Sequence, residues 1–164
     1  MADFDPIPIL RTLQRHRVAF IVVGGIAAIA QGSPLPTYDL DVTPARDPQN
    51  LERLALALTG LEATLRVPHG PGVPFPVDAR LLTGGEAWTL DTRLGPFDLV
   101  VVPPGTTGYD DLDGDAGDAT LGENLVVRVA SLRDVIRMKQ ASGRPKDLAA
   151  LPALYAALER SRER

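Results

Sequence analysis

Hydrophobic and polar residues in the first third of the chain follow a pattern that predicts two helices and two short strands. Ile7 to Arg17 places its apolar residues on one side, as an amphipathic helix does. The run VAFIVVGG is almost entirely apolar and predicts a buried strand that ends at paired glycines. Ile26 to Gln31 then predicts a helix of small residues, and a second strand, TYDLDV, follows the breaker run GSPLP.

The rest of the chain predicts further strands and helices. Asn50 to Thr59 has helical apolar spacing and begins with a residue type that caps helices. AWTLDTR and FDLVVV, joined by Leu94-Gly95-Pro96, predict an antiparallel hairpin. A loose acidic segment leads to one more strand, NLVVRVA, and then to two helices. We therefore expect one α+β domain over residues 1–164, with a core at about 18–130 and C-terminal helices at about 131–162.

Composition narrows the class of protein. A chain of 164 residues fits one domain with a sizeable hydrophobic core. It has no cysteine, which excludes disulfides, thiolate metal sites and cysteine nucleophiles. No apolar run approaches the roughly 20 residues that a membrane helix needs. The opening MADFDPIPIL carries two acids and two prolines before any basic residue, so we do not expect it to be a signal peptide. We expect a cytoplasmic protein without a membrane partner.

Charge is unevenly distributed along the chain. The net charge of −4 argues against broad, non-specific binding to nucleic acid. All the charged residues from Asp110 to Glu123 are nevertheless acidic, whereas the segment from Arg128 to Lys146 has six basic residues and one acidic residue. The basic stretch predicts either a locally positive face that meets a polyanion or an ordinary solvated helix surface.

Two carboxylates in the second strand are the first candidate for chemistry. Side chains alternate across a strand, so Asp39 and Asp41 point to one face and Leu40 to the other. Like charges on one face repel each other, and a divalent cation between them would remove that cost. Mg²⁺ prefers oxygen ligands and often takes one or two carboxylates together with substrate phosphates. The alternative is a polar strand edge that faces solvent.

Two further features favour a nucleotide and metal site. Asp98 lies inside the apolar run FDLVVV, where an acid is costly unless something pairs with it. A cation held by the first two carboxylates would supply that partner, and Asp91 is a weaker candidate. Gly24 and Gly25 lie where a strand becomes a helix and would let the backbone approach a phosphate. The alternative for the glycine pair is a simple tight turn, and no P-loop signature follows it.

These motifs carry a family resemblance. The order of paired glycines, a T-x-D-x-D strand and a lone aspartate on a later strand resembles the polymerase-β type of nucleotidyltransferase fold. Thr37 to Asp41, GPFDLVVVPPG and SLRDVIRMKQASGRPKDLAAL are similar to the small nucleotidyltransferases of the AbiEii/MenT-related type, over roughly residues 19–158. Many of those are toxins of type IV toxin–antitoxin pairs. The resemblance implies a mixed sheet flanked by helices, with a short C-terminal helical region.

The resemblance also implies roles for individual residues. Asp39, Asp41 and Asp98 would hold Mg²⁺, or Mn²⁺ in its place, and an NTP would be the substrate. Gly24 and Gly25 would seat its phosphates. The acceptor would be a hydroxyl, such as a tRNA 3′ end, and a cognate antitoxin would be a protein partner. The residues expected to grip the RNA backbone are Arg133, Arg137, Arg144 and Lys146.

The helix SLRDVIRMKQAS tests the resemblance independently. Leu132, Val135, Ile136 and Lys139 fall on one stripe at helical spacing, so the lysine is on the core-facing side. It either extends along apolar surface to solvent or reaches into a cleft, and by resemblance it is a catalytic and nucleotide-binding residue.

Asp147 is the second candidate catalytic residue in this region. It flanks the next predicted stripe, which consists of Leu148, Leu151, Tyr155 and Leu158. Its alternative role is that of an acid near a helix N-terminus.

Two positions depart from the resemblance. Many nucleotidyltransferases of this superfamily have serine where this chain has Gly25, and relatives often have arginine where it has Leu35. Each change would alter how the nucleotide is held. The departures keep open an alternative function, a non-catalytic module that uses the same fold for protein interaction or nucleotide sensing.

Overall fold

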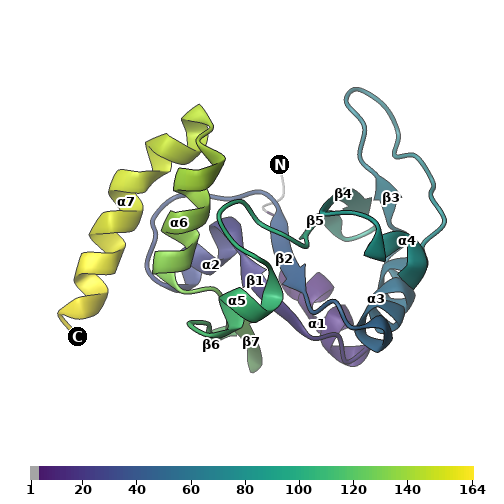
Figure 1. Cartoon of the computed structure of the whole chain (residues 1–164), viewed down its shortest axis with the longest axis horizontal. Helices are drawn as coiled ribbons and strands as arrows, with labels where there is room; N and C mark the ends of the chain where they lie inside the picture. The colour runs from purple at the N-terminus through teal and green to yellow at the C-terminus, as the bar shows by residue number, and fades with distance from the viewer. Residues whose placement is uncertain (1–3) are drawn as a thin grey trace.

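The computed structural model describes residues 4–164 of the chain. A mixed seven-stranded sheet forms the centre of this part. Its strand order is β3-β4-β5-β2-β1-β7-β6 (Figure 1). The strands are β1 (Phe20–Val23), β2 (Leu40–Pro44), β3 (Thr64–Leu65), β4 (Ala87–Thr92), β5 (Gly95–Val100), β6 (Gly117–Leu121) and β7 (Leu125–Val129). The helices are α1 (Ile7–Arg15), α2 (Gly24–Ala30), α3 (Pro48–Gly60), α4 (Ala79–Thr83), α5 (Tyr109–Asp113), α6 (Leu132–Ser142) and α7 (Pro145–Arg162).

The centre of the sheet sets the position of the acidic residues. β2 pairs antiparallel with β1 and parallel with β5, while β1 also pairs parallel with β7. The β2–β5 register places Asp41 directly beside Asp98. Figure 1 shows α6 and α7 together on one side of the molecule and α3, α4, β3 and β4 on the other, so the acidic strands lie between the two groups. None of the described helices has both the length and the apolar character needed to cross a membrane.

Alternation along β2 and β5 separates the core from the acids. Leu40, Val42, Phe97 and Leu99 are fully buried on one face of the sheet. Because successive side chains point to opposite faces, the aspartates of the same two strands emerge on the other face. The hydrophobic core therefore fixes the register that brings the carboxylates together, and one residue of slippage would bury them.

Most predicted elements are present, with differences at their ends. The predicted hairpin is β4–β5, but its turn is Arg93-Leu94, and Gly95 begins β5 with φ of 120°. The segment predicted to be loose and acidic contains α5 and β6, and β6 pairs antiparallel with β7. The sequence pattern missed β6 because its exposed residues show little apolar alternation.

The last helix is rotated relative to its predicted stripe. Leu154 and Ala157 are buried beside Asp147, whereas Leu148 and Tyr155 are 48% and 43% exposed. The predicted stripe was therefore wrong at these two positions. The physical reason is the ion pair between Asp147 and Lys139 of α6, which turns the side of α7 that carries Asp147 toward its neighbour.

Asn50 ties α3 to the two central strands. It was predicted to cap the helix, but the cap is Asp47, whose carboxylate accepts from the Asn50 N–H at 2.9 Å. The buried Asn50 side chain accepts from Ala19 N–H at 2.7 Å. Its amide donates to the carbonyl oxygens of Ala19 and Ala45 at 2.9 and 2.8 Å. One side chain thus holds the segment before β1 and the segment after β2.

Replacing Asn50 by alanine is expected to destabilise the fold. The change leaves the Ala19 N–H and the Ala45 carbonyl without these hydrogen bonds, which costs about 3 kcal/mol in total. The Ala19 carbonyl still accepts from the Ala45 N–H at 3.0 Å. Urea denaturation followed by circular dichroism measures the free energy of unfolding. Gln49→Ala, at the exposed neighbouring position, is the matched control. Equal midpoints for the two variants would contradict the role given to Asn50.

Candidate active site

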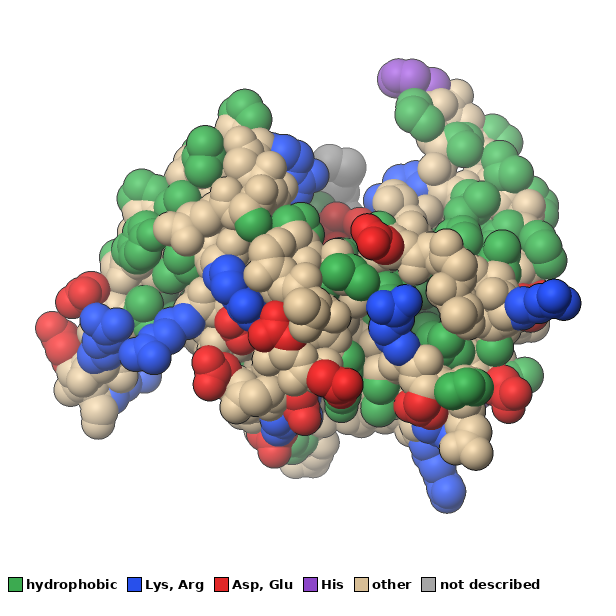
Figure 2. Space-filling model, viewed as in Figure 1, with side chains coloured by type: hydrophobic (Ala, Val, Ile, Leu, Met, Phe, Trp, Pro, Cys, Tyr) green, Lys and Arg blue, Asp and Glu red, His purple; other side chains and the backbone are tan. Residues whose placement is uncertain are grey.

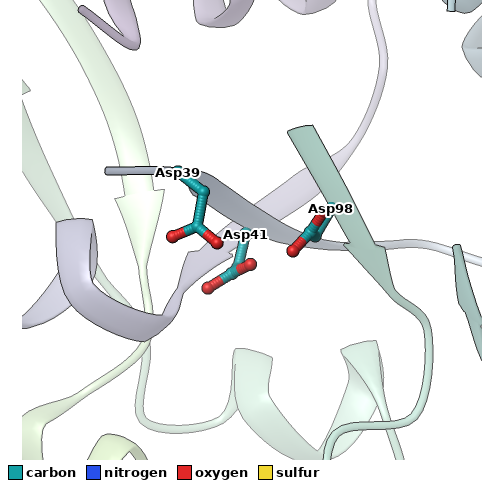
Figure 3. A group of neighbouring side chains, drawn as sticks. All are labelled: Asp39, Asp41 and Asp98. Carbon is teal, nitrogen blue, oxygen red and sulfur yellow. The ribbon is translucent and has the colours of Figure 1, made fainter. Parts of the chain in front are cut away.

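Three aspartates from two neighbouring strands converge on one space. Asp41 belongs to β2 and Asp98 to β5, and Asp39 comes just before β2. One carboxylate oxygen from each lies within 4.8 Å of the others. Figure 3 shows the three carboxylates gathered on the same side of these strands. The predicted convergence of these residues is thus present in the structure.

The cluster is electrostatically costly as a set of bare carboxylates. Burial raises the pKa of Asp41 to about 7, helped by the neighbouring charges of Asp39 and Asp98 and opposed by Lys139. Burial also raises the pKa of Asp98, against the effect of Arg66. A divalent cation would remove this repulsion. Because all the donors are carboxylate oxygens, the cluster fits a hard cation of the kind that Mg²⁺ and Mn²⁺ represent.

The paired glycines pack directly against the acidic segment. Gly24 has φ of 66°, and a Cβ on it would collide with Asp41 Oδ2. A Cβ on Gly25 would lie 2.6 Å from the Thr37 hydroxyl oxygen. That hydroxyl donates to Asp39 Oδ1 at 3.4 Å. Both glycines are therefore required by close approach, and the Thr37 hydroxyl takes the space that a side chain at position 25 would need.

Lys139 reaches the site from α6 and is held by Asp147 of α7. Its Nζ lies 3.1 Å from Asp147 Oδ1, and the Asp147 side chain is only 1% exposed. Asp147 Oδ2 accepts from Ser142 Oγ and Arg144 Nε, each at 2.7 Å. Burial by itself raises the pKa of Asp147, but the hydrogen bonds from Arg144, Ser142 and Lys139 hold that pKa well below its usual range. Asp147 is thus a buried counter-ion that positions the charged side chains of Lys139 and Arg144.

A cleft of about 810 Å³ joins the three aspartates, Gly25 and Lys139. Figure 2 shows the upper surface hollowed between the α6–α7 half of the molecule and the half that carries β3 and β4. One part of the lining is polar and charged, and consists of Gly25, Thr37, Asp39, Asp41, Arg66, Asp98, Lys139, Arg144 and Lys146. Another part is mostly apolar, and includes Leu35, Pro36, Tyr38, Ala149, Ala150 and Leu154. A cleft with this division can hold a flat apolar group beside an anionic one.

Only two of the four basic residues expected to contact RNA are brought together. Arg144 and Lys146 line the cleft, although Arg144 is paired with Asp147. Arg137 forms ion pairs with Asp111 at 3.2 Å and with Asp134 at 2.9 Å. The remaining residue, Arg133, lines a separate hollow with Arg160 and Arg162.

The predicted positive face is partly neutralised. Besides the Arg137 pairs, Arg128 pairs with Asp113 at 2.8 Å and with Asp118 at 3.6 Å. The acidic segment therefore folds back onto the basic one.

Arg66 is a residue of the cleft that the sequence pattern did not indicate. It follows β3, and its guanidinium donates to Asp91 Oδ1 at 2.9 Å and to Asp98 Oδ1 at 3.1 Å. Asp91, a weaker metal candidate, thus lies outside the three-carboxylate cluster and pairs with arginine instead. The sequence contains one hint of a partner for Arg66, which is the presence of Asp91 in a polar strand. The spacing between residues 66 and 91 does not predict that they pair.

Comparison with known proteins rests on structure. No family model matches the chain, and no curated protein matches its sequence. The lincosamide antibiotic adenylyltransferase LnuA, solved with lincomycin bound, is similar over 95% of this chain and 99% of its own, with a TM-score of 0.63 and 11% identity. The antibiotic-resistance factor ANT(2″)-Ia is similar over 92% and 80%, with a TM-score of 0.58 and 14% identity.

A third structure extends the comparison. A Thermotoga maritima protein provisionally classed as a nucleotidyltransferase is similar over 96% of this chain and 91% of its own, with a TM-score of 0.54 and 14% identity. Together with the mixed sheet, these similarities show that the chain has the nucleotidyltransferase fold, as the sequence resemblance predicted.

The Asp41 carboxyl is expected to make stability depend on pH. Its pKa is about 7 in the folded protein and about 3.8 in the unfolded chain, so its stabilising contribution is lost as pH rises through 7. Asp41→Asn removes that loss. Without divalent ions, the variant should melt on the order of 5 °C above the parent at pH 8, with a smaller difference toward pH 4.

Differential scanning fluorimetry measures this difference, with Asp110→Asn at an exposed position as the control. Added Mg²⁺ should raise the melting temperature of the parent at pH 8 more than that of Asp41→Asn, because only the parent has the full carboxylate set. Parallel melting curves for parent and Asp41→Asn at every pH would count against the electrostatics described here.

Gly25→Ser is expected to destabilise the protein, because its Cβ would meet Thr37 at 2.6–2.7 Å. Overpacking of this kind costs about 1–3 kcal/mol. Adding Thr37→Gly should recover part of the loss, since it removes both the hydroxyl oxygen and the Cβ that a side chain at position 25 would meet. Gly60→Ser is the control, since a Cβ there meets nothing within 4 Å. Chemical denaturation decides the matter: additive losses in the double variant would show that the two side chains do not compete for one space.

Proposed function

We propose that this protein transfers a nucleotide from an NTP to a hydroxyl acceptor, with Asp39, Asp41 and Asp98 holding one or two Mg²⁺ ions. The observation that carries the proposal is the three-carboxylate cluster, which lies beside Gly25 and Lys139 in one cleft of a nucleotidyltransferase fold. Mn²⁺ has the same preference for oxygen donors and is proposed as a substitute.

The reaction forms a bond between the acceptor oxygen and the α-phosphorus of the NTP and breaks the bond from that phosphorus to the leaving pyrophosphate. Bound divalent ions supply Lewis-acid stabilisation of the charge on the α-phosphate and lower the pKa of the attacking hydroxyl. Asp98 accepts the hydroxyl proton. Lys139, held by Asp147, stabilises the charge on the pyrophosphate. The backbone at Gly24 and Gly25 approaches the β and γ phosphates closely because neither residue has a side chain.

As the acceptor we propose a tRNA 3′ end, and as the cellular role a toxin that a cognate antitoxin neutralises in the cytoplasm. The motif resemblance supports this proposal. Arg144 and Lys146 on the cleft wall are positively charged and can contact the phosphate backbone of RNA. Arg133 and Arg137 lie outside the cleft, so they would contact RNA only beyond its 3′ end.

A small-molecule hydroxyl is the second candidate acceptor. Its support is the similarity to LnuA, an adenylyltransferase of lincosamide antibiotics, which extends over nearly the whole of both chains. The pairing of Arg137 and Arg144 with acids also reduces the positive charge available to RNA. This candidate retains the same metal cluster and differs only in what enters the acceptor side of the cleft.

Transfer of label from α-³²P-labelled NTPs with Mg²⁺ tests the proposal. Each NTP is offered with bulk tRNA, and separately with lincomycin, the antibiotic bound in the LnuA structure. The parent should label one acceptor class, and Asp41→Ala should lower the rate at least about 100-fold because it removes a metal ligand. Asp110→Ala, an exposed acid outside the cleft, should transfer normally.

Four outcomes separate the alternatives. Labelled tRNA supports the toxin proposal, and a labelled antibiotic supports the second candidate. Transfer by Asp41→Ala at the parent's rate would show that the metal assignment is wrong. Calorimetric binding of an NTP with Mg²⁺, without transfer to any acceptor, would favour the non-catalytic module.

A further inference from the structure

The Arg66 side chain connects the surface of the sheet to the carboxylate cluster. Its backbone N–H donates to the Thr89 carbonyl at 3.0 Å, which fixes the residue beside β4. Its Nε donates to Asp91 Oδ1 at 2.9 Å, and its Nη2 donates to Asp98 Oδ1 at 3.1 Å and to the Leu90 carbonyl. The guanidinium is therefore fixed by oxygen atoms from both strands of the β4–β5 hairpin.

Exposure decreases along this chain of side chains. Asp91 is 44% exposed, Arg66 29% and Asp98 18%. Only Asp98 belongs to the group whose oxygens lie within 4.8 Å of one another. Asp91 is thus an outer partner that orients the guanidinium, and Arg66 is the inner partner that reaches the cluster. A planar guanidinium can bind two carboxylates in fixed directions, which an ammonium cannot do.

We propose that Arg66, oriented by Asp91, is a positioning residue that sets the direction of the Asp98 carboxylate in the metal cluster. It binds one oxygen of Asp98 and leaves the other for a cation. The proposal rests on the function proposed above and adds to it a residue pair that acts through Asp98. Partners of metal ligands commonly act in this way, and their loss weakens metal affinity by about 10–100-fold.

The competing explanation is purely structural. An exposed ion pair between β3 and β4 contributes little to stability and would not affect the metal. A second competing explanation gives Arg66 only its positive charge, which lowers the repulsion within the cluster and also opposes binding of a cation. The three explanations predict different changes in metal affinity, so the metal alone is a suitable probe.

The experiment measures Mn²⁺ binding to the full chain by the electron paramagnetic resonance signal of free Mn²⁺, without nucleotide. Arg66→Lys keeps the charge but cannot hold Asp91 and Asp98 together. It should weaken Mn²⁺ affinity about 10-fold, and Asp91→Asn should have a smaller effect in the same direction. The double variant should be no weaker than Arg66→Lys, because both changes break one unit. Arg93→Ala, an exposed arginine that contacts the Gly60 carbonyl, is the control.

Kinetics supply the second readout. In Arg66→Lys, kcat for nucleotide transfer should fall at least about 10-fold while KM for the NTP changes less than about 2-fold, because the defect lies in the metal cluster. Parent affinity for Mn²⁺ in both Arg66→Lys and Arg66→Ala would overturn the proposal, as would tighter binding in Arg66→Ala with no loss in Arg66→Lys. If the parent binds Mn²⁺ in an Arg66-dependent way but transfers no nucleotide, the proposed function fails and the positioning role stands.

Discussion

Repulsion between three carboxylates is the constraint on which the rest of the site depends. The in-register pairing of β2 with β5 forces Asp41 beside Asp98, and the buried face of the same strands prevents them from separating. The protein therefore maintains a cluster that, without a cation, keeps the pKa of Asp41 near 7. Such a strained arrangement is typical of functional sites, where local structure is held by the surrounding fold.

The surroundings of the cluster consist of groups that limit this cost. Lys139 approaches from α6 and Arg66 from the end of β3, and each is held by a further acid, Asp147 or Asp91. In both cases a basic side chain near the cluster is oriented by a carboxylate that lies outside the cluster. The two sides differ in burial, because Asp147 is almost fully buried whereas Asp91 is half exposed. The ion pair on the Lys139 side is thus the more buried of the two.

The sequence allowed the central part of this arrangement to be predicted, and physical reasons explain the rest. Asp39 and Asp41 follow from strand alternation, and Asp98 from the cost of an acid in an apolar run. Arg66 could not be predicted, because its contact with Asp98 spans 32 residues and depends on the pairing of β3 with β4. Among the helices, the α6 stripe was confirmed, whereas the α7 stripe was partly wrong because a buried ion pair outweighed hydrophobic spacing.

The central claim is that one divalent ion is bound by all three aspartates, and crystals soaked with Mn²⁺ test it most directly. Anomalous diffraction locates manganese independently of any assumed site. We predict a peak within about 2.0–2.6 Å of an oxygen from each of Asp39, Asp41 and Asp98, the range for hard cations on oxygen ligands. A well-ordered cleft with no such peak at millimolar Mn²⁺, or a peak that only one of the three carboxylates contacts, would contradict the account.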